Sequence, residues 1–327
     1  MKPKIFSFGV KVASHFSYRI HGLNILSLQP LKKEQDTFAS ADIVIQWVSQ
    51  LPQLPACAES HILRNQANES QAILCKYNNG YLSVDYFDCG FFYLQNSTLS
   101  VFQKHPDNDF FMAMLTTQIL PLLSSLYRVT LHGGVVVQEG RAAIYLGSEG
   151  VGKSTLATYL WQNGFHIYSD DVAAIEIDSS VRVYPGLPEI RVNRDSCENL
   201  LSEAQGQLLP VKLAKQQILF SQSEFAMASV VAIFILSPQK KSSSLQKSAL
   251  SAAQCFLPLI KNQFRWDIWN PKIVRNEFEV LASLCQHVPC WQLEYPLDYA
   301  SLPWVRQQIE GSLHAPKENA AGFRQLL

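Results

Sequence analysis

The sequence predicts an α/β protein with a mainly β N-terminal region. Short segments of alternating polar and apolar residues recur through residues 1–103, and this period is typical of half-buried strands. Apolar residues then recur at helical spacing between residues 107 and 127. From residue 129, β-rich runs flank a glycine-rich loop and a helix-forming run, which is the order of elements in an α/β unit.

Length and composition suit one to two domains. The chain has 327 residues, of which 47% are apolar and 17% charged, with a formal net charge of zero. No cluster of Lys and Arg exceeds a pair such as Lys240 and Lys241, so we expect no nucleic-acid partner. The apolar stretch 230–236 is too short to cross a bilayer. The mixed segment after Lys2 and Lys4 leads us to expect no signal peptide. We therefore expect no membrane partner.

Seven cysteines are scattered along the chain without a CxxC pair. An odd number at irregular spacing is typical of reduced thiols, so we expect a cytoplasmic protein. The run from Cys285 to Cys290 includes His287, but no second ligand pair accompanies it. We interpret this run as a helix end that breaks at Pro289, and not as a metal site.

Residues 1–127 are expected to form an accessory or substrate-binding region. Asn79 and Gly80 predict a hairpin turn because both tolerate positive φ. A buried helix is expected to begin near Asp107 or Asn108 and to end near Tyr127. Strands are expected at 18–25, 43–48, 73–77, 81–87 and 91–94.

Residues 128–312 are expected to form a second domain, and residues 313–327 a flexible tail. A hairpin of strands 130–137 and 142–146 is expected around the turn 138–141. A helix at 154–163, ended by Gly164, leads to a strand at 166–169. Further strands are expected at 181–184 and 230–236, and helices at 278–285 and 302–310.

The loop at residues 147–154 matches G-x-x-x-x-G-K-[ST] at every required position. Gly147 and Gly152 allow the backbone N–H groups to surround phosphate oxygens. Lys153 can reach the β- and γ-phosphates, and the Ser154 hydroxyl can bind Mg²⁺. The loop therefore predicts ATP and Mg²⁺ binding. The expected nucleotide-binding residues are Gly147, Ser148, Glu149, Gly150, Val151, Gly152, Lys153, Ser154 and Thr155.

Asp170 and Asp171 favour a kinase over the other proteins that use such a loop. They follow the strand after the loop's helix, and adjacent parallel strands would place both carboxylates beside the γ-phosphate. One carboxylate can then hold Mg²⁺ while the other accepts a proton from an attacking hydroxyl. No apolar segment ending in Asp-Glu occurs downstream, which is evidence against a motor.

His132 lies in the segment Leu131-His132-Gly133-Gly134. If the strands on either side of residues 138–141 form a hairpin, His132 lies near the phosphate end of the loop. A lone histidine beside apolar strands is more often structural, so its residue type alone leaves both interpretations open.

The run from residue 131 to residue 174 resembles the catalytic domain of HPr kinase/phosphorylase. It is more similar to stand-alone HPr-kinase-like serine kinases that modify peptides in bacterial natural-product clusters. The matching residues are His132-Gly133, 147–154, Leu156-Ala157, Gly164, Ser169-Asp170-Asp171-Val172 and the later turn Tyr184-Pro185-Gly186.

The resemblance implies a P-loop domain of HPr-kinase type and a role for each matching site residue. It implies that His132 supports the γ-phosphate region, and that Asp170 acts as the base with assistance from Asp171. Glu189 lies in a Glu-Ile-Arg segment whose glutamate binds a second metal in that family, although Val192 replaces the family's glycine. The implied metal ligands are Ser154, Asp171 and Glu189. The family's later Gly-flanked Arg loop has no counterpart, so the resemblance does not extend to the phosphorylase reaction.

The sequence thus predicts a serine kinase that phosphorylates a peptide or protein acceptor. A small-molecule kinase on the same fold and a non-catalytic nucleotide-binding scaffold are the alternatives, and a homo-oligomer stays open. The aromatic-rich segment 264–271 could line an acceptor groove or pack a C-terminal helix on the sheet. Arg191, Arg194 and Arg265 are candidates for stabilising the transferred charge.

Overall fold

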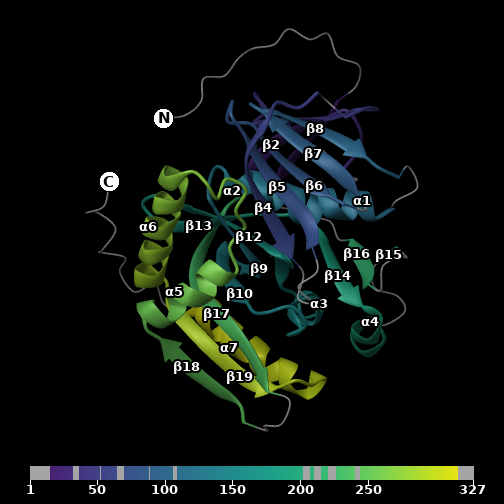
Figure 1. The fold of residues 1–327 in the computed structure, drawn as a ribbon. Helices are drawn as coiled ribbons and strands as arrows, with labels where there is room; N and C mark the ends of the chain where they lie inside the picture. Colours follow the sequence, from purple (N-terminus) through teal and green to yellow (C-terminus); the bar gives the residue numbers. More distant parts are fainter. Residues whose placement is uncertain are drawn as a thin grey trace.

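The described part of the protein is mixed α/β, with more strands than helices, which confirms the α/β part of the predicted class. The computed structural model describes residues 15–31, 37–51, 53–64, 70–87, 89–105, 109–201, 207–209, 215–219, 226–239 and 244–315. Two eight-stranded sheets and one three-stranded sheet carry most of the described chain. The first large sheet lies above the second in Figure 1, and α5, α6 and α7 lie around the second sheet.

The N-terminal sheet has the strand order β1-β2-β3-β8-β7-β6-β5-β4. Its strands are β1 (Phe16–Ile20), β2 (Leu23–Ser27), β3 (Ile43–Trp47), β4 (Cys57–Arg64), β5 (Ser70–Tyr77), β6 (Leu82–Tyr86), β7 (Gly90–Gln95) and β8 (Thr98–Gln103). The hairpin predicted at Asn79 and Gly80 is confirmed, since Gly80 has φ 81° and joins the antiparallel strands β5 and β6. The strands β4 and β8 were not predicted.

The single strand predicted at residues 18–25 is wrong, because a turn at His21 and Gly22 divides it into β1 and β2. Both turn residues have positive φ, at 52° and 74°. The turn is fixed by hydrogen bonds from distant segments. Ser124 Oγ and Arg128 Nη1 donate to the His21 carbonyl at 3.0 and 2.6 Å, and His21 N donates to Pro185 O at 3.0 Å. His21 is thus where the two halves of the chain meet.

His21 is expected to make folding stability fall in mild acid. Burial, reinforced by the charge of Arg128, lowers its pKa from 6.5 to about 3, and neither ring nitrogen has a hydrogen-bond partner among the described residues. Between those pH values the unfolded chain binds a proton that the folded chain excludes. The free energy of unfolding should therefore fall by about 2 kcal/mol between pH 7 and pH 5.

Urea titrations at both pH values would measure this loss. The His21→Asn variant is the matched control, since asparagine tolerates a left-handed backbone and does not titrate. The variant should lose less stability than wild type between the two pH values. An identical loss in both proteins would show that groups other than His21 cause the fall in stability between pH 7 and pH 5.

The buried helix predicted after the N-terminal sheet is present, but it is interrupted. It consists of α1 (Asp109–Met114), a π-helical turn (Leu115–Ile119) and α2 (Leu120–Ser125); the predicted start at residues 107–108 lies outside the described residues. Pro121 has no amide hydrogen to donate to the carbonyl four residues earlier. The preceding turn widens instead, and Leu120 N donates to Leu115 O, the spacing of a π-helix.

The second large sheet is built around β9. The predicted hairpin is confirmed, because β9 (Val129–Gln138) pairs antiparallel with β10 (Arg141–Leu146), and Glu139 and Gly140 have φ 51° and 72° at the turn. On its other edge β9 pairs with β11 (His166–Ser169) and β12 (Val172–Ile177). The expectation that the strands before and after the loop's helix are adjacent is wrong, since β9 lies between them.

The remaining elements complete this sheet and add a small third one. Parallel pairing of β10 with β17 closes the strands β10, β9, β12, β13 and β17 into a circuit. The third sheet, β14-β16-β15, lies beside α4 at the right of Figure 1. The elements are α3 (Lys153–Gln162), β13 (Val181–Tyr184), β14 (Glu189–Asn193), α4 (Arg194–Leu200), β15 (Gln207–Leu209), β16 (Lys215–Leu219), β17 (Ala228–Gln239), β18 (Gln246–Leu250), α5 (Ala252–Lys261), α6 (Pro271–His287), β19 (Cys290–Pro296) and α7 (Leu302–His314).

The cysteines are not all reduced thiols. Cys255 at the start of α5 and Cys290 at the start of β19 form a disulfide, which the irregular spacing in sequence did not predict. Cys285 is buried beside them as a free thiol, and burial raises its pKa to about 11. No His, Cys, Asp or Glu cluster capable of holding a metal occurs within the described ranges.

The aromatic-rich segment after α5 packs against the N-terminal core. Trp266 is fully buried in that core, and the Arg265 side chain forms an ion pair with Glu277 at 2.6 Å. On the way to this position, Phe264 N donates to Thr130 O at 2.9 Å, which attaches the segment to β9. The segment therefore has a packing role, and Arg265 does not line the cavity described below.

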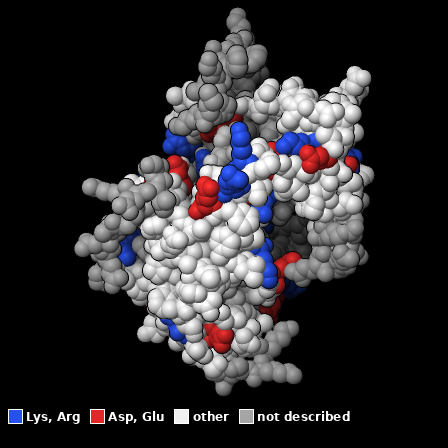
Figure 2. All heavy atoms as spheres, turned by 60° about the vertical axis from the view of Figure 1, so that its left-hand side comes forward, with Lys and Arg blue, Asp and Glu red and all other residues white. Residues whose placement is uncertain are grey.

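The molecular surface mixes charges of both signs. Figure 2 shows Lys and Arg interspersed with Asp and Glu on one face, between wide uncharged areas. In the part of the chain that the structure describes, no helix combines the length and apolar character needed to cross a bilayer. The predicted tail after residue 315 lies outside the described residues.

Candidate active site

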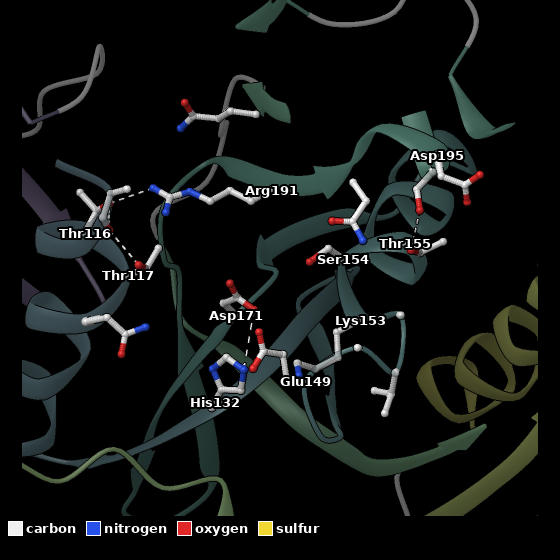
Figure 3. Close-up of a pocket in the computed structure, with 18 of the residues that line it drawn as sticks. Thr116, Thr117, His132, Glu149, Lys153, Ser154, Thr155, Asp171, Arg191 and Asp195 are labelled. Carbon is white, nitrogen blue, oxygen red and sulfur yellow. Dashed lines mark hydrogen bonds and ion pairs between the residues drawn. The ribbon is translucent and has the colours of Figure 1, made fainter. Parts of the chain in front are cut away.

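A cavity of about 750 Å³ lies where the two halves of the chain meet. This volume is within the range of about 300–1,000 Å³ that is usual for small-molecule sites. The loop from Glu149 to Thr155 forms one wall, and the segment from Met112 to Gln118 forms another. His132, Asp171 and Arg191 also line the cavity. Figure 3 shows Asp171 in the space between the helix that carries Thr116 and the loop that carries Lys153.

The loop between β10 and α3 has the backbone conformation that its glycines permit. Gly150 and Gly152 have φ 81° and 90°, a left-handed region in which other residues are strained. Gly152 is the N-cap of α3, and Lys153 begins the helix. The Lys153 ammonium turns back over the loop and donates to Gly147 O at 2.8 Å and to Ser148 O at 3.2 Å. The N-terminal end of α3, with its partial positive charge, favours an anion here.

His132 and Asp171 are brought together by β9. His132 pairs with Val172 in the register of β9 and β12, and Gly133 N donates to Asp171 O at 3.0 Å. The His132 Nε2 atom lies 4.0 Å from Asp171 Oδ1. Gly133 also lies opposite Leu146, the last residue before the loop. The hairpin therefore places His132 beside the loop, as the hairpin hypothesis required, and Figure 3 shows His132, Asp171 and Glu149 side by side.

Asp170 does not line the cavity, in contrast to its predicted role as the base. Its side chain is only 5% exposed, and Oδ2 accepts a hydrogen bond from Arg191 N at 2.9 Å. The two aspartates lie in a bend between β11 and β12, where their side chains have different surroundings. The cavity-facing carboxylate is Asp171.

Glu189 is likewise turned away from the cavity. Its side chain is buried, and the carboxylate contacts Arg191 Nη2 at 3.1 Å and accepts from Gln217 Nε2. Of the three predicted metal ligands, Ser154 and Asp171 line the cavity and Glu189 does not. A charge-paired glutamate behind the wall is suited to holding Arg191 in place.

Arg191 is the cationic side chain that connects the site to the N-terminal region. Its Nη2 donates to Thr116 Oγ1 at 3.1 Å, across the cavity from the loop (Figure 3). Burial lowers the pKa of Arg191, while the charges of Asp170 and Asp171 oppose the shift. From the sequence, Arg191 was only one of three arginines that were candidates for stabilising the transferred charge. Its contacts could not be predicted because they come from elements far apart in the chain.

Several lining residues were missed altogether. Thr116, Thr117 and Gln118 lie on the π-helical turn, and Asp195 lies at the start of α4. Thr155 Oγ1 and Ser196 Oγ lie 2.8 Å apart and connect α3 to α4. The only signal for the first group in sequence was Pro121 after an apolar helical run, which indicates a break and not a site.

Comparison with known proteins leaves the family of this chain unassigned. No protein-family model matches it, and no curated protein matches its sequence. One similar solved structure is the Hpr(Ser) kinase/phosphatase from Coxiella burnetii, with 11% identity and a TM-score of 0.30 over 56% of this chain and 94% of that chain. A TM-score this low establishes no common fold, so the site is interpreted from its own residues.

Proposed function

We propose that the protein transfers the γ-phosphoryl group of ATP to a hydroxyl group, with a serine of a peptide or protein as the acceptor. One observation carries the proposal: a loop with the phosphate-binding sequence and the Asp171 carboxylate line the same cavity. An anion-binding wall opposite a proton acceptor is the arrangement that phosphoryl transfer to a hydroxyl requires.

The polar groups of the cavity fit a bound nucleotide and its metal. The first N–H groups of α3 and the Lys153 ammonium are suited to phosphate oxygens, and the Ser154 hydroxyl is suited to Mg²⁺. Mg²⁺, when bound, neutralises phosphate charge. In this proposal Lys153 exchanges its bonds to Gly147 O and Ser148 O for bonds to phosphate. The carbonyl bonds keep the ammonium inside the loop beforehand.

The transfer itself exchanges one P–O bond for another. The serine Oγ forms a bond to the γ-phosphorus, the bond from that phosphorus to the bridging oxygen breaks, and ADP leaves. The serine proton passes to the Asp171 carboxylate, and His132, 4.0 Å away, stabilises that carboxylate and the transferring group. Asp170 acts indirectly, by holding the backbone of Arg191, whose guanidinium stabilises charge on the transferring oxygens.

The nucleotide part of the proposal is tested at Lys153. Replacing Lys153 with methionine keeps the length of the side chain but removes its charged donor, so the affinity for ATP·Mg²⁺ should fall about ten- to a hundredfold. Isothermal titration calorimetry would measure the change. Lys261→Met, at the end of α5, should bind ATP like wild type. Equal affinity in Lys153→Met and wild type would contradict the assignment of the loop.

The catalytic part is tested by incubation with γ-labelled ATP and serine-containing acceptors. Label should move to the acceptor hydroxyl. The new phosphate ester should be as labile in alkali as other phosphoserine esters. Nucleotide binding without transfer to any acceptor would favour the scaffold alternative. Transfer only to small hydroxyl compounds would favour the small-molecule kinase.

A further inference from the structure

The N-terminal region contributes an uncharged wall to the cavity, opposite the phosphate-binding loop. We call it the acceptor wall, and its members come from four separate segments of the N-terminal region. Every residue that this region contributes to the cavity lining is uncharged in the described part of the chain, whereas Lys153, Asp171 and Arg191 line the other sides. The acceptor wall consists of Leu31, Gln71, Tyr86, Met112, Thr117 and Gln118.

The π-helical turn shapes this wall. A π turn holds its backbone wider than an α-helix, and such turns are frequent at functional sites. Thr117 Oγ1 donates to Ala113 O at 2.7 Å, so its hydroxyl hydrogen is used within the helix. The half-buried Gln118 amide, in contrast, makes no hydrogen bond with the described residues and faces the cavity. One wall of the site thus presents an unused donor and an unused acceptor.

The same turn is coupled to the site. Thr116 Oγ1 accepts from Arg191 Nη2 at 3.1 Å, and Arg191 N donates to Asp170, the neighbour of Asp171. A ligand on the acceptor wall would therefore lie beside the Arg191 guanidinium, which this turn contacts through Thr116. The wall has polar side chains such as Gln118 and apolar side chains such as Met112. One ligand with both polar and apolar groups could therefore contact both kinds.

We propose that the acceptor wall binds an uncharged peptide segment with an apolar residue next to the phosphorylated serine. A primary amide such as Gln118 can donate to a peptide carbonyl and accept from a peptide N–H at once. Met112 offers a flexible apolar surface for the neighbouring side chain, and the largely buried Leu31 and Tyr86 line the same cavity. The wall itself contributes no cation for an acidic or phosphorylated acceptor, and Arg191 beside it already forms an ion pair with Glu189. The inference rests on the proposed kinase function and adds the class of acceptor.

Kinetics with two short synthetic peptides would test the preference. One carries leucine on both sides of a single serine, and the other carries aspartate at the same places. The leucine peptide should have the higher kcat/KM by about tenfold, the effect of burying one or two apolar groups. Met112→Ala should reduce this preference, while Met112→Leu should retain it. Equal kcat/KM values for both peptides in wild type would overturn the proposal.

The role of Gln118 has its own readout. Gln118→Ala should raise the KM for the leucine peptide about tenfold, the loss expected from a pair of hydrogen bonds, with kcat and the affinity for ATP unchanged. Gln307→Ala, on the exposed side of α7, is the matched control and should behave like wild type. A change in kcat with no change in KM would assign Gln118 to the fold of the turn and overturn its role in binding.

Crosslinking separates this inference from the proposed function. The leucine peptide, with a photoreactive group beside serine, is irradiated with the protein and a non-hydrolysable ATP analogue, and the attachment site is mapped by mass spectrometry. Attachment at residues 112–118, together with no transfer in the separate assay with γ-labelled ATP, would support peptide binding at the acceptor wall and refute the kinase function. Transfer to free hydroxyl compounds with no attachment there would refute the wall and leave phosphoryl transfer standing.

Discussion

Replacing Asp171 with asparagine is expected to slow phosphoryl transfer by about 10²–10⁴-fold, the usual contribution of a positioned proton acceptor. The affinity for ATP should not fall, because the change removes a negative charge from the cavity that holds the phosphates. Asparagine has nearly the shape of aspartate, so the hydrogen bond between Gly133 N and Asp171 O, which involves the backbone alone, is retained. Single-turnover transfer and ATP titration of the same sample would measure both effects.

Asp170→Asn is the informative comparison, because the two aspartates are neighbours with different surroundings. The asparagine carbonyl can still accept from Arg191 N, so this variant should lose less activity than Asp171→Asn. Asp178→Asn, on the exposed turn between β12 and β13, controls for the loss of one charge. If Asp170→Asn abolished transfer while Asp171→Asn remained active, the proton acceptor would be Asp170, reached through a rearranged loop.

Replacing Trp266 with alanine is expected to lower the free energy of unfolding by about 3–5 kcal/mol, the usual cost of removing a large buried side chain. Trp266 is fully buried among residues of the N-terminal core, so its removal leaves a cavity there. Its Nε1 makes no hydrogen bond with the described residues, so Trp266→Phe removes volume only and should cost less. Urea denaturation followed by circular dichroism would give both values.

Trp304→Ala is the matched control for this prediction. Trp304 is only partly buried, at the edge of a different cluster, so its loss should cost less than that of Trp266. Stability that falls equally in the two variants would contradict the central place given to Trp266. A Trp266→Ala protein that also loses activity at temperatures well below its unfolding transition would show that the site depends on this contact.

The parts of the fold that depend on neighbouring residues could be predicted from the sequence. Gly140 and Gly80 mark hairpin turns because of their φ preference, and the period of apolar residues located α3 and α7. The same local rules located the loop from Gly147 to Ser154. The turn at His21 and Gly22 was missed, although the alternation changes phase there, with apolar residues at 18 and 20 before the turn and at 23 and 25 after it.

The parts that depend on distant pairing could not be predicted. Which of Asp170 and Asp171 faces the cavity depends on the bend between β11 and β12. Gly133 N donates to Asp171 O and Arg191 N donates to Asp170 Oδ2 at this bend, and the sequence alone does not predict these contacts. The resemblance implied that Glu189 is a metal ligand. Its carboxylate instead forms an ion pair with Arg191 of β14 and accepts a hydrogen bond from Gln217 of β16. Gln118 was overlooked because its position opposite the loop follows from tertiary contacts alone.

The crossing of residues 262–266 from the second half into the first has a practical consequence. A boundary at residues 127 and 128 would be the natural place to divide the chain for expression, yet the N-terminal fragment would then lack Trp266 and expose the apolar surface that surrounds it. The complementary fragment would expose Trp266 in turn. Each piece made alone should aggregate, and the two made together in one cell should assemble and recover binding of ATP.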